Sequence, residues 1–156
     1  MKLYRIARSV NIRDVSGEGA RLYGGRWNEK GVPVIYAASS PSLAALEFLV
    51  HVPIVLAPRD LSICRFDLPD DVSVTRVRKS VLPDDWKSSP PGAGTQEIGA
   101  RWARAGRSLL LLVPSVVVPD ENNVLINPQH QEFRKVKKRI KPFEFDSRLL
   151  TRQENR

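Results

Sequence analysis

The residues from Pro41 to Val50, PSLAALEFLV, are apolar apart from one serine and Glu47. The run predicts a helix, because Ser39 or Ser40 can cap it and a proline fits the first turn, where its missing amide donor costs nothing. A carboxylate set among leucines and a phenylalanine is costly to bury unless it is paired. The fold must therefore either expose Glu47 or give it polar partners.

Two arrangements of this helix meet that requirement. On a surface helix, Glu47 would be the solvated position while the leucines face a core. Alternatively, the carboxylate faces a site. Arg26 and Tyr36 lie just upstream, on what read as two strands of one hairpin, residues 26–28 and 32–37. This proximity favours a site in which a guanidinium and an aromatic ring lie beside Glu47.

The rest of the pattern consists of strands with helices between them, which indicates an α+β fold with two or three inserted helices. The glycine-rich polar stretch 13–25 is expected to be a loop. A second helix is expected to begin with Thr95 as its cap and to end at Gly106. Its apolar stripe consists of Ile98, Trp102 and Ala105. The other expected elements are strands at 1–8, 61–67, 72–77, 108–113, 115–118 and 124–126, and a helical turn at 128–133.

The chain has 156 residues, enough for one domain that buries about two-thirds of the surface its unfolded chain would expose. We expect this domain to cover residues 1–150 and the tail 151–156 to fray. The lone cysteine, Cys64, excludes an internal disulfide, and with only two histidines no metal site is expected. No apolar run approaches the roughly twenty residues of a membrane helix, which predicts a cytoplasmic protein without a membrane span.

The net charge of +8 and the pI near 10.1 favour an anionic partner, either nucleic acid, a phosphorylated small molecule or an acidic protein. Much of the excess charge lies in FRKVKKRIKPF, residues 133–143. This segment could be a phosphate-binding stripe. It could equally be an edge strand whose lysines prevent aggregation.

Several common catalytic classes lack their motifs in this chain. His51 and His130 are far apart, and no group of carboxylates has metal-ligand spacing. There is no GxSxG motif for a serine nucleophile and no Walker motif. GEGARLYG is not a dinucleotide fingerprint, because it precedes an expected strand where that motif should open a helix.

The residue types that remain are arginine, tyrosine, glutamate and serine, and together they suit chemistry at an anionic nucleotide. Guanidinium groups hold phosphates, a tyrosine ring stacks on a flat base, and a carboxylate stabilises a cationic sugar-like transition state. Cleavage of nicotinamide from NAD needs these parts. The leaving group is already a pyridinium cation, so no strong general acid is required.

The order of motifs resembles the RES-domain toxins of RES-Xre toxin–antitoxin pairs over nearly the whole chain. The motifs are YRIAR, GxGARLYGGRWN, VIYAASSPSLAALE, VPSVVVP, NVLINPQH and PFEFDSRL. The resemblance implies a single domain with an ADP-ribosyltransferase-like fold that acts on NAD. It also implies site residues, namely Arg26, Tyr36, Glu47 and Ser115 as catalytic and Arg5, Arg26, Tyr36 and Asn127 as NAD-binding.

The roles implied are phosphate or ribose binding by Arg5 and Arg26, stacking on nicotinamide by Tyr36, and stabilisation of the ribosyl cation by Glu47. Ser115 would position the ribose or a neighbouring side chain. The acceptor stays open between water, inorganic phosphate and a protein side chain. The resemblance further implies an Xre-family helix-turn-helix antitoxin as a partner.

One alternative function belongs to a different class. A basic RNA-binding module or ribonuclease toxin would use the run from Arg134 to Arg139 as its phosphate track. Aromatic residues do not interleave with that run as a base-stacking surface requires. Direct nucleic-acid binding is therefore not our expectation.

Overall fold

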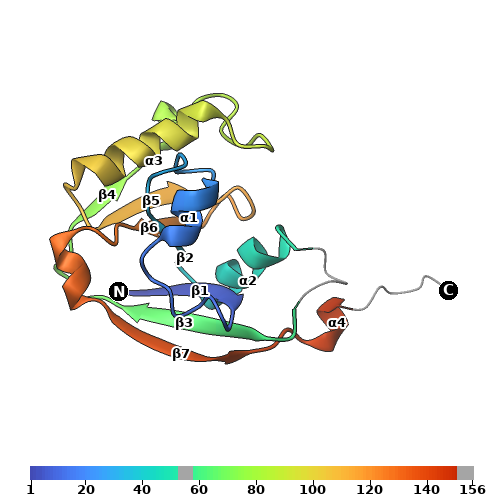
Figure 1. The fold of residues 1–156 in the computed structure, drawn as a ribbon. Coiled ribbons are helices and arrows are strands. Elements are labelled where there is room, and N and C mark those ends of the chain that lie inside the picture. Colours follow the sequence, from blue (N-terminus) through green and yellow to red (C-terminus); the bar gives the residue numbers. More distant parts are fainter. Residues whose placement is uncertain (53–57, 151–156) are drawn as a thin grey trace.

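The computed structural model describes residues 1–52 and 58–150, so the expected frayed tail at 151–156 lies outside the described residues. Its described part is one α+β domain, as predicted, and it is built on a seven-stranded sheet (Figure 1). The strands are β1 (Lys2–Arg8), β2 (Ile35–Ala38), β3 (Leu61–Asp67), β4 (Val74–Arg76), β5 (Leu110–Pro114), β6 (Asn122–Ile126) and β7 (Lys137–Phe143). The helices are α1 (Glu18–Tyr23), α2 (Pro41–Leu49), α3 (Ala93–Ala105) and α4 (Ser147–Leu150), with 3-10 turns η2 (Lys79–Val81) and η3 (Gln131–Lys135).

The sheet order is β4-β5-β6-β2-β1-β3-β7, and the join between β1 and β2 is its weakest. Those two strands pair only at Tyr4 and Ala38, whereas β1 pairs with β3 along its whole length. The sheet therefore opens between a β1-β3-β7 part and a β2-β6-β5-β4 part. This opening provides room for a pocket.

Helix α2 packs beside this opening, next to β1 and β2 (Figure 1). Ser40 caps it by accepting a hydrogen bond from the Leu43 amide at 3.1 Å, and Pro41 is its first residue, as predicted. Leu43 and Ala44 are buried against Ile6, in a cluster that also includes Leu61 and Ile63. The apolar side of the predicted helix thus packs on the sheet and leaves Glu47 in a half-buried position.

Helix α3 covers the other part of the sheet (Figure 1). Trp102 and its neighbours pack in one buried cluster with Trp27 and with residues of β5 and β6. Gly99 is required at this contact, because a Cβ there would lie 1.8 Å from the carbonyl oxygen of Trp27. The helix consequently fixes the backbone of the segment that carries Arg26.

Three expected elements near the site are wrong. Residues 26–28 form no strand, only a bridge between Gly25 and Asn28, so the predicted hairpin is absent from the described residues. The segment instead folds around the buried Asn28 side chain, which donates to the carbonyls of Ala20 and Val32. The expected loop 13–25 contains helix α1, and residues 115–118 form a turn because two of their amides bond to the Ser115 hydroxyl.

The second helix differs from expectation at its start and in its buried face. It begins at Ala93, and Thr95 lies inside it with its hydroxyl donating to the Gly92 carbonyl. Gly106 ends it in the left-handed conformation, as predicted. The buried face contains Gly99, Ala100, Trp102 and Ala103, whereas Ala105 is exposed.

The basic segment forms β7, which ends the sheet as an edge strand. This edge position is compatible with both roles considered for the segment, phosphate binding and prevention of aggregation. Within residues 1–52 and 58–150, no helix combines the length and apolar character needed to traverse a bilayer.

Candidate active site

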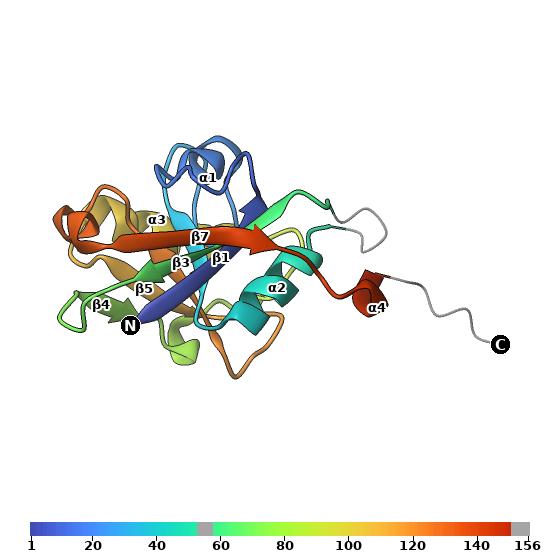
Figure 2. The same ribbon diagram turned by 90° about the horizontal axis from the view of Figure 1, so that it is seen from below.

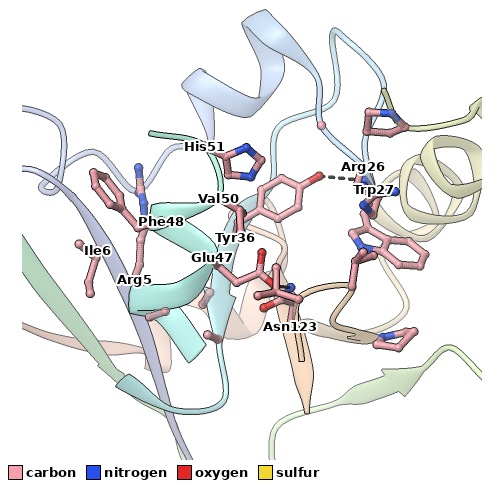
Figure 3. Close-up of a pocket in the computed structure, with 18 of the residues that line it drawn as sticks. Arg5, Ile6, Arg26, Trp27, Tyr36, Glu47, Phe48, Val50, His51 and Asn123 are labelled. Atoms are coloured by element: carbon pink, nitrogen blue, oxygen red, sulfur yellow. Dashed lines mark hydrogen bonds between the residues drawn. The ribbon is translucent and has the colours of Figure 1, made fainter. Parts of the chain in front are cut away.

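A pocket of about 900 Å³ occupies the opening between β1 and β2. Its wall contains Arg5 from β1, Arg26 from the loop before β2, Tyr36 from β2 and Glu47 from α2. Figure 3 shows these side chains around one space, with the Tyr36 ring between Glu47 and Arg26. The structure thus brings together four of the residues selected from the sequence.

The Glu47 carboxylate is held by two side chains. Ser115 Oγ donates to Glu47 Oε1 at 2.8 Å, and Asn123 Nδ2 donates to the same oxygen at 2.5 Å. Among the described residues, no donor is found at Oε2. The half-buried Glu47 therefore has polar partners at Oε1, while Oε2 is available to a ligand in the pocket that the side chain lines.

Ser115 lies behind the acid and does not itself line the pocket. Its side chain is fully buried, and its oxygen accepts hydrogen bonds from the amides of Val117 and Val118 at 3.0 and 2.9 Å. With both amides donating to it, the hydroxyl proton is directed at Glu47. Of the two roles expected for Ser115, the geometry matches the positioning of a neighbouring side chain.

The Tyr36 phenol is fixed at its far end. Its hydroxyl donates to Asn28 Oδ1 at 2.8 Å and accepts from the Trp27 amide at 3.0 Å. Burial raises the pKa of the Tyr36 phenol well above its ordinary value, although the Trp27 hydrogen bond and the Arg26 charge act in the opposite direction. The group is thus a neutral, rigid wall at physiological pH, and its ring presents a flat face for stacking.

Arg26 connects the pocket to the loop before α3. Its Nη1 donates to the carbonyls of Trp86 and Ser88 at 2.7 and 2.9 Å. From that loop Lys87 and Ser89 also line the pocket. Because Nη1 carries these bonds, the Nε and Nη2 donors are the part of the guanidinium that can serve an anion.

Arg5 approaches the pocket from β1. Its Nη1 donates to the backbone carbonyl of Asp14 at 2.9 Å. Burial lowers the pKa of Arg5, and the nearby Asp14 charge partly offsets that effect. A guanidinium stays charged under such conditions, so two fixed cations, Arg5 and Arg26, border the pocket.

Asn127 does not lie in the pocket wall, contrary to expectation. Its side chain is buried and donates to the Ala103 carbonyl at 3.0 Å, while its oxygen accepts from the Gln129 amide at 3.0 Å. These bonds tie α3 to the turn after β6. We therefore do not keep Asn127 as an NAD-binding residue.

Sequence reasoning missed three residues of this region. Asn123 is the second donor to Glu47, Asn28 is the anchor of the Tyr36 hydroxyl, and His51 lines the pocket just after α2. Asn28 stands two positions after Arg26 in the quoted GGRWN motif, which is the signal that could have identified it. Across the described residues, no three histidine, cysteine or acidic side chains gather in a way that could hold a metal ion.

The arrangement combines an oriented carboxylate, two arginine side chains and an aromatic face in one pocket. Such a site suits an anionic ligand with a planar ring and a centre that becomes positively charged.

The fold resembles the crystal structure of the M. tuberculosis MbcT-MbcA toxin–antitoxin complex. The TM-score is 0.74, and the identity is 22% over 91% of this chain and 83% of that chain. At that identity the likeness concerns the fold alone.

The RES domain family model matches residues 2–147. Curated relatives include the "Toxin Res" of Photorhabdus laumondii, 42% identical over 96% of this chain and 97% of its own length. Another is the "Prs ADP-ribosylating toxin" of a Sphingobium species, 41% identical over 92% of this chain and 91% of its own length. The chain therefore belongs to the RES domain family, as the motif order predicted.

Proposed function

We propose that the protein is a RES-family toxin that binds NAD in this pocket and breaks its nicotinamide–ribose bond. The observation that carries the proposal is the Glu47 carboxylate, held at Oε1 by Ser115 and Asn123 inside a pocket bordered by Arg5, Arg26 and Tyr36. The name of the Sphingobium relative, which refers to ADP-ribosylation, agrees with NAD as the substrate.

Binding would follow from charge and shape. Arg5 and Arg26 would hold the pyrophosphate or a ribose phosphate, because guanidinium groups pair with phosphate oxygens at short distance. The Tyr36 ring would stack on the nicotinamide. A pocket of about 900 Å³ is at the upper end of the size range for small-molecule sites, which suits a dinucleotide.

The bond that breaks is the one between the ribose C1′ and the nicotinamide nitrogen. Its electron pair leaves with nicotinamide, which becomes neutral, and positive charge develops at C1′. Glu47 Oε2 would stabilise that charge, since its position is already set by the two bonds at Oε1 and needs no reorganisation. The acceptor then attacks C1′ and releases one proton to solvent.

The acceptor determines the class of reaction. Water would give ADP-ribose, inorganic phosphate would give ADP-ribose 1-phosphate, and a protein side chain would become ADP-ribosylated. Incubation of purified protein with NAD labelled in the adenine ring, with and without phosphate and with a cell extract, separates the three products by chromatography and gel. Intact NAD under all three conditions would contradict the proposal.

Such a toxin requires an inhibitor in its own cell. We propose an Xre-family helix-turn-helix antitoxin that acts in the cytoplasm. The structural relative was solved as a toxin–antitoxin complex, which supports an antitoxin as the kind of partner. A carboxylate of that antitoxin, placed beside Arg26, would occupy the position of the dinucleotide phosphates. Coexpression with a candidate Xre-family antitoxin should yield a complex without NAD-cleaving activity, and a fully active complex would contradict this mode of inhibition.

A further inference from the structure

A second groove lies on the sheet face that carries α2, toward the edge strand β7. It has a volume of about 460 Å³ and shares only Tyr4 with the wall of the first pocket. Figure 2 shows β7 running along the outside of β3 and β1, with α2 nearby. The groove is lined by Tyr4, Ile63, Arg65, Arg139, Lys141 and Phe143, among others.

Strand register explains why these side chains gather. Arg65 is paired with both Tyr4 and Arg139, and Ile63 is paired with Lys141. Paired residues point to the same face of a sheet, and successive residues of a strand point to opposite faces. Lys138 directly precedes Arg139 on β7 and is paired with Phe66, so it is on the opposite face.

The groove carries more positive charge than its acids neutralise. Asp67 is shared by Arg65 Nε, at 3.0 Å from Oδ1, and Arg139 Nε, at 3.4 Å from Oδ2. The buried Arg65 Nε has no aligned hydrogen-bond partner despite that short distance. Lys141 has no ion pair with any residue in 1–52 or 58–150, so the group contains three cations and the Asp67 carboxylate pairs with two of them.

Protection of a sheet edge does not account for this arrangement. Edge lysines that prevent aggregation need to lie only on the outermost strand. Here Arg65 lies on the neighbouring strand β3 and is only about one-third exposed at its side chain, at 32%. Tyr4 comes from β1, one strand further in. The charge extends across the sheet face, as expected for a binding groove.

We propose that this groove binds an extended acidic segment of a protein partner, lying along β7 with carboxylates at alternate positions. Alternate residues of an extended chain are about 6.6 Å apart and project to one side, as Arg139 and Lys141 do along β7. Within residues 1–52 and 58–150, β7 is the last strand of the sheet, and its outer edge can add main-chain hydrogen bonds to such a segment. The apolar floor at Ile63 and Phe143 accommodates residues between the acids.

The groove suits a peptide better than single-stranded RNA. RNA-binding surfaces offer a series of aromatic faces to successive bases. In this groove Phe143 is already packed edge-on against Phe145, with ring centroids 5.0 Å apart. Tyr4 alone would remain for stacking, so the groove supplies charge and an extended backbone edge but few base platforms.

The test uses the full-length protein and a fluorescein-labelled ten-residue peptide in which glutamate and threonine alternate. A second peptide of equal composition carries its five glutamates in one block. We expect fluorescence anisotropy to show tighter binding of the alternating peptide. Arg139→Gln and Lys141→Gln should each weaken that binding about three- to tenfold, because each removes one charge-assisted contact.

Lys138→Gln is the matched control, with the same charge change on the same strand but on the other face. It should alter the dissociation constant less than about twofold. Equal loss in Lys138→Gln, equal binding of the two peptides, or no binding of either by the wild type would overturn the proposal. Tighter binding of ten-nucleotide polyuridine, lost in Arg139→Gln, would also overturn it and would assign the groove to nucleic acid. Nicotinamide release should be unchanged in all three variants, so the outcome is independent of the proposed NAD chemistry.

Discussion

The Ser115 hydroxyl donates a hydrogen bond to Glu47 across 68 positions of sequence, with 2.8 Å between Oγ and Oε1. The serine is fully buried, and two backbone amides fix its oxygen from behind. Asn123 supplies the second donor to the same carboxylate oxygen. The orientation of the acid is therefore determined by β6 and by the turn after β5, and not by α2 alone.

Ser115→Ala should lower the rate of nicotinamide release by about ten- to a hundredfold, because a lost hydrogen bond to a charged group corresponds to about 1.5–3 kcal/mol. The Michaelis constant for NAD should change little, since the serine does not line the pocket. Steady-state kinetics measure both values. A variant whose Michaelis constant rises while its turnover stays constant would place Ser115 in binding instead of positioning.

Tyr36→Phe retains the ring but removes the hydroxyl that joins Asn28 to the Trp27 amide. We expect a loss of about 1–3 kcal/mol in the free energy of unfolding, because a buried acceptor and a buried donor lose their partner. NAD binding should weaken less in Tyr36→Phe than in Tyr36→Ala, which also removes the stacking face. Urea denaturation and NAD titration of both variants provide the comparison, and equal affinities would argue against stacking.

Gly99→Ala should disrupt the pocket from a distance. The new Cβ would lie 1.8 Å from the Trp27 carbonyl oxygen, so α3 and the segment carrying Arg26 must separate. We expect destabilisation of about 1–3 kcal/mol from overpacking, together with loss of NAD cleavage. Gly19→Ala, in α1 with no atom within 4 Å of its added Cβ, is the control and should keep both properties. Full activity of Gly99→Ala would show that α3 and the Trp27 backbone can separate without disturbing the pocket.

Glu132→Gln should reduce the pH dependence of stability. Hydrogen bonds from the Ser73 side chain and amide lower the pKa of the Glu132 carboxyl, with smaller effects from the Lys135 and His130 charges. A carboxyl whose folded pKa is below its unfolded value stabilises the fold fully above the unfolded pKa, and this contribution disappears as the pH falls through the folded pKa. Urea midpoints measured at neutral pH and near pH 4 should therefore differ less in the variant than in the wild type. An identical difference would exclude Glu132 as a contributor.

The central part of the site could be predicted because it is encoded locally. An acid in an apolar helix with a serine cap and an early proline indicates both the element and its unusual residue, and α2 begins and is capped as expected. The partners of that acid could not be derived in the same way. Asn123 is 76 positions away, and only the pairing of β2 with β6 brings it to α2.

The loop that carries Arg26 shows where local patterns fail. Turn residues suggested a hairpin, but the segment folds around the Asn28 side chain, which donates to the carbonyls of Ala20, Glu29 and Val32. Side-chain hydrogen bonds of this kind compete with strand pairing and leave no periodic signal. Arg26 thus lines the pocket even though the strand proposed to carry it is absent from the described residues.

The most direct measurement of the central claim is nicotinamide release from NAD by purified wild-type protein and by Glu47→Gln. Glutamine keeps the shape of the side chain and an oxygen that can accept from Ser115 and Asn123, so NAD affinity should stay within about threefold while release slows by about a hundredfold or more. Equal rates in the two proteins, or no release by the wild type, would contradict the role of Glu47 at a NAD-cleaving site.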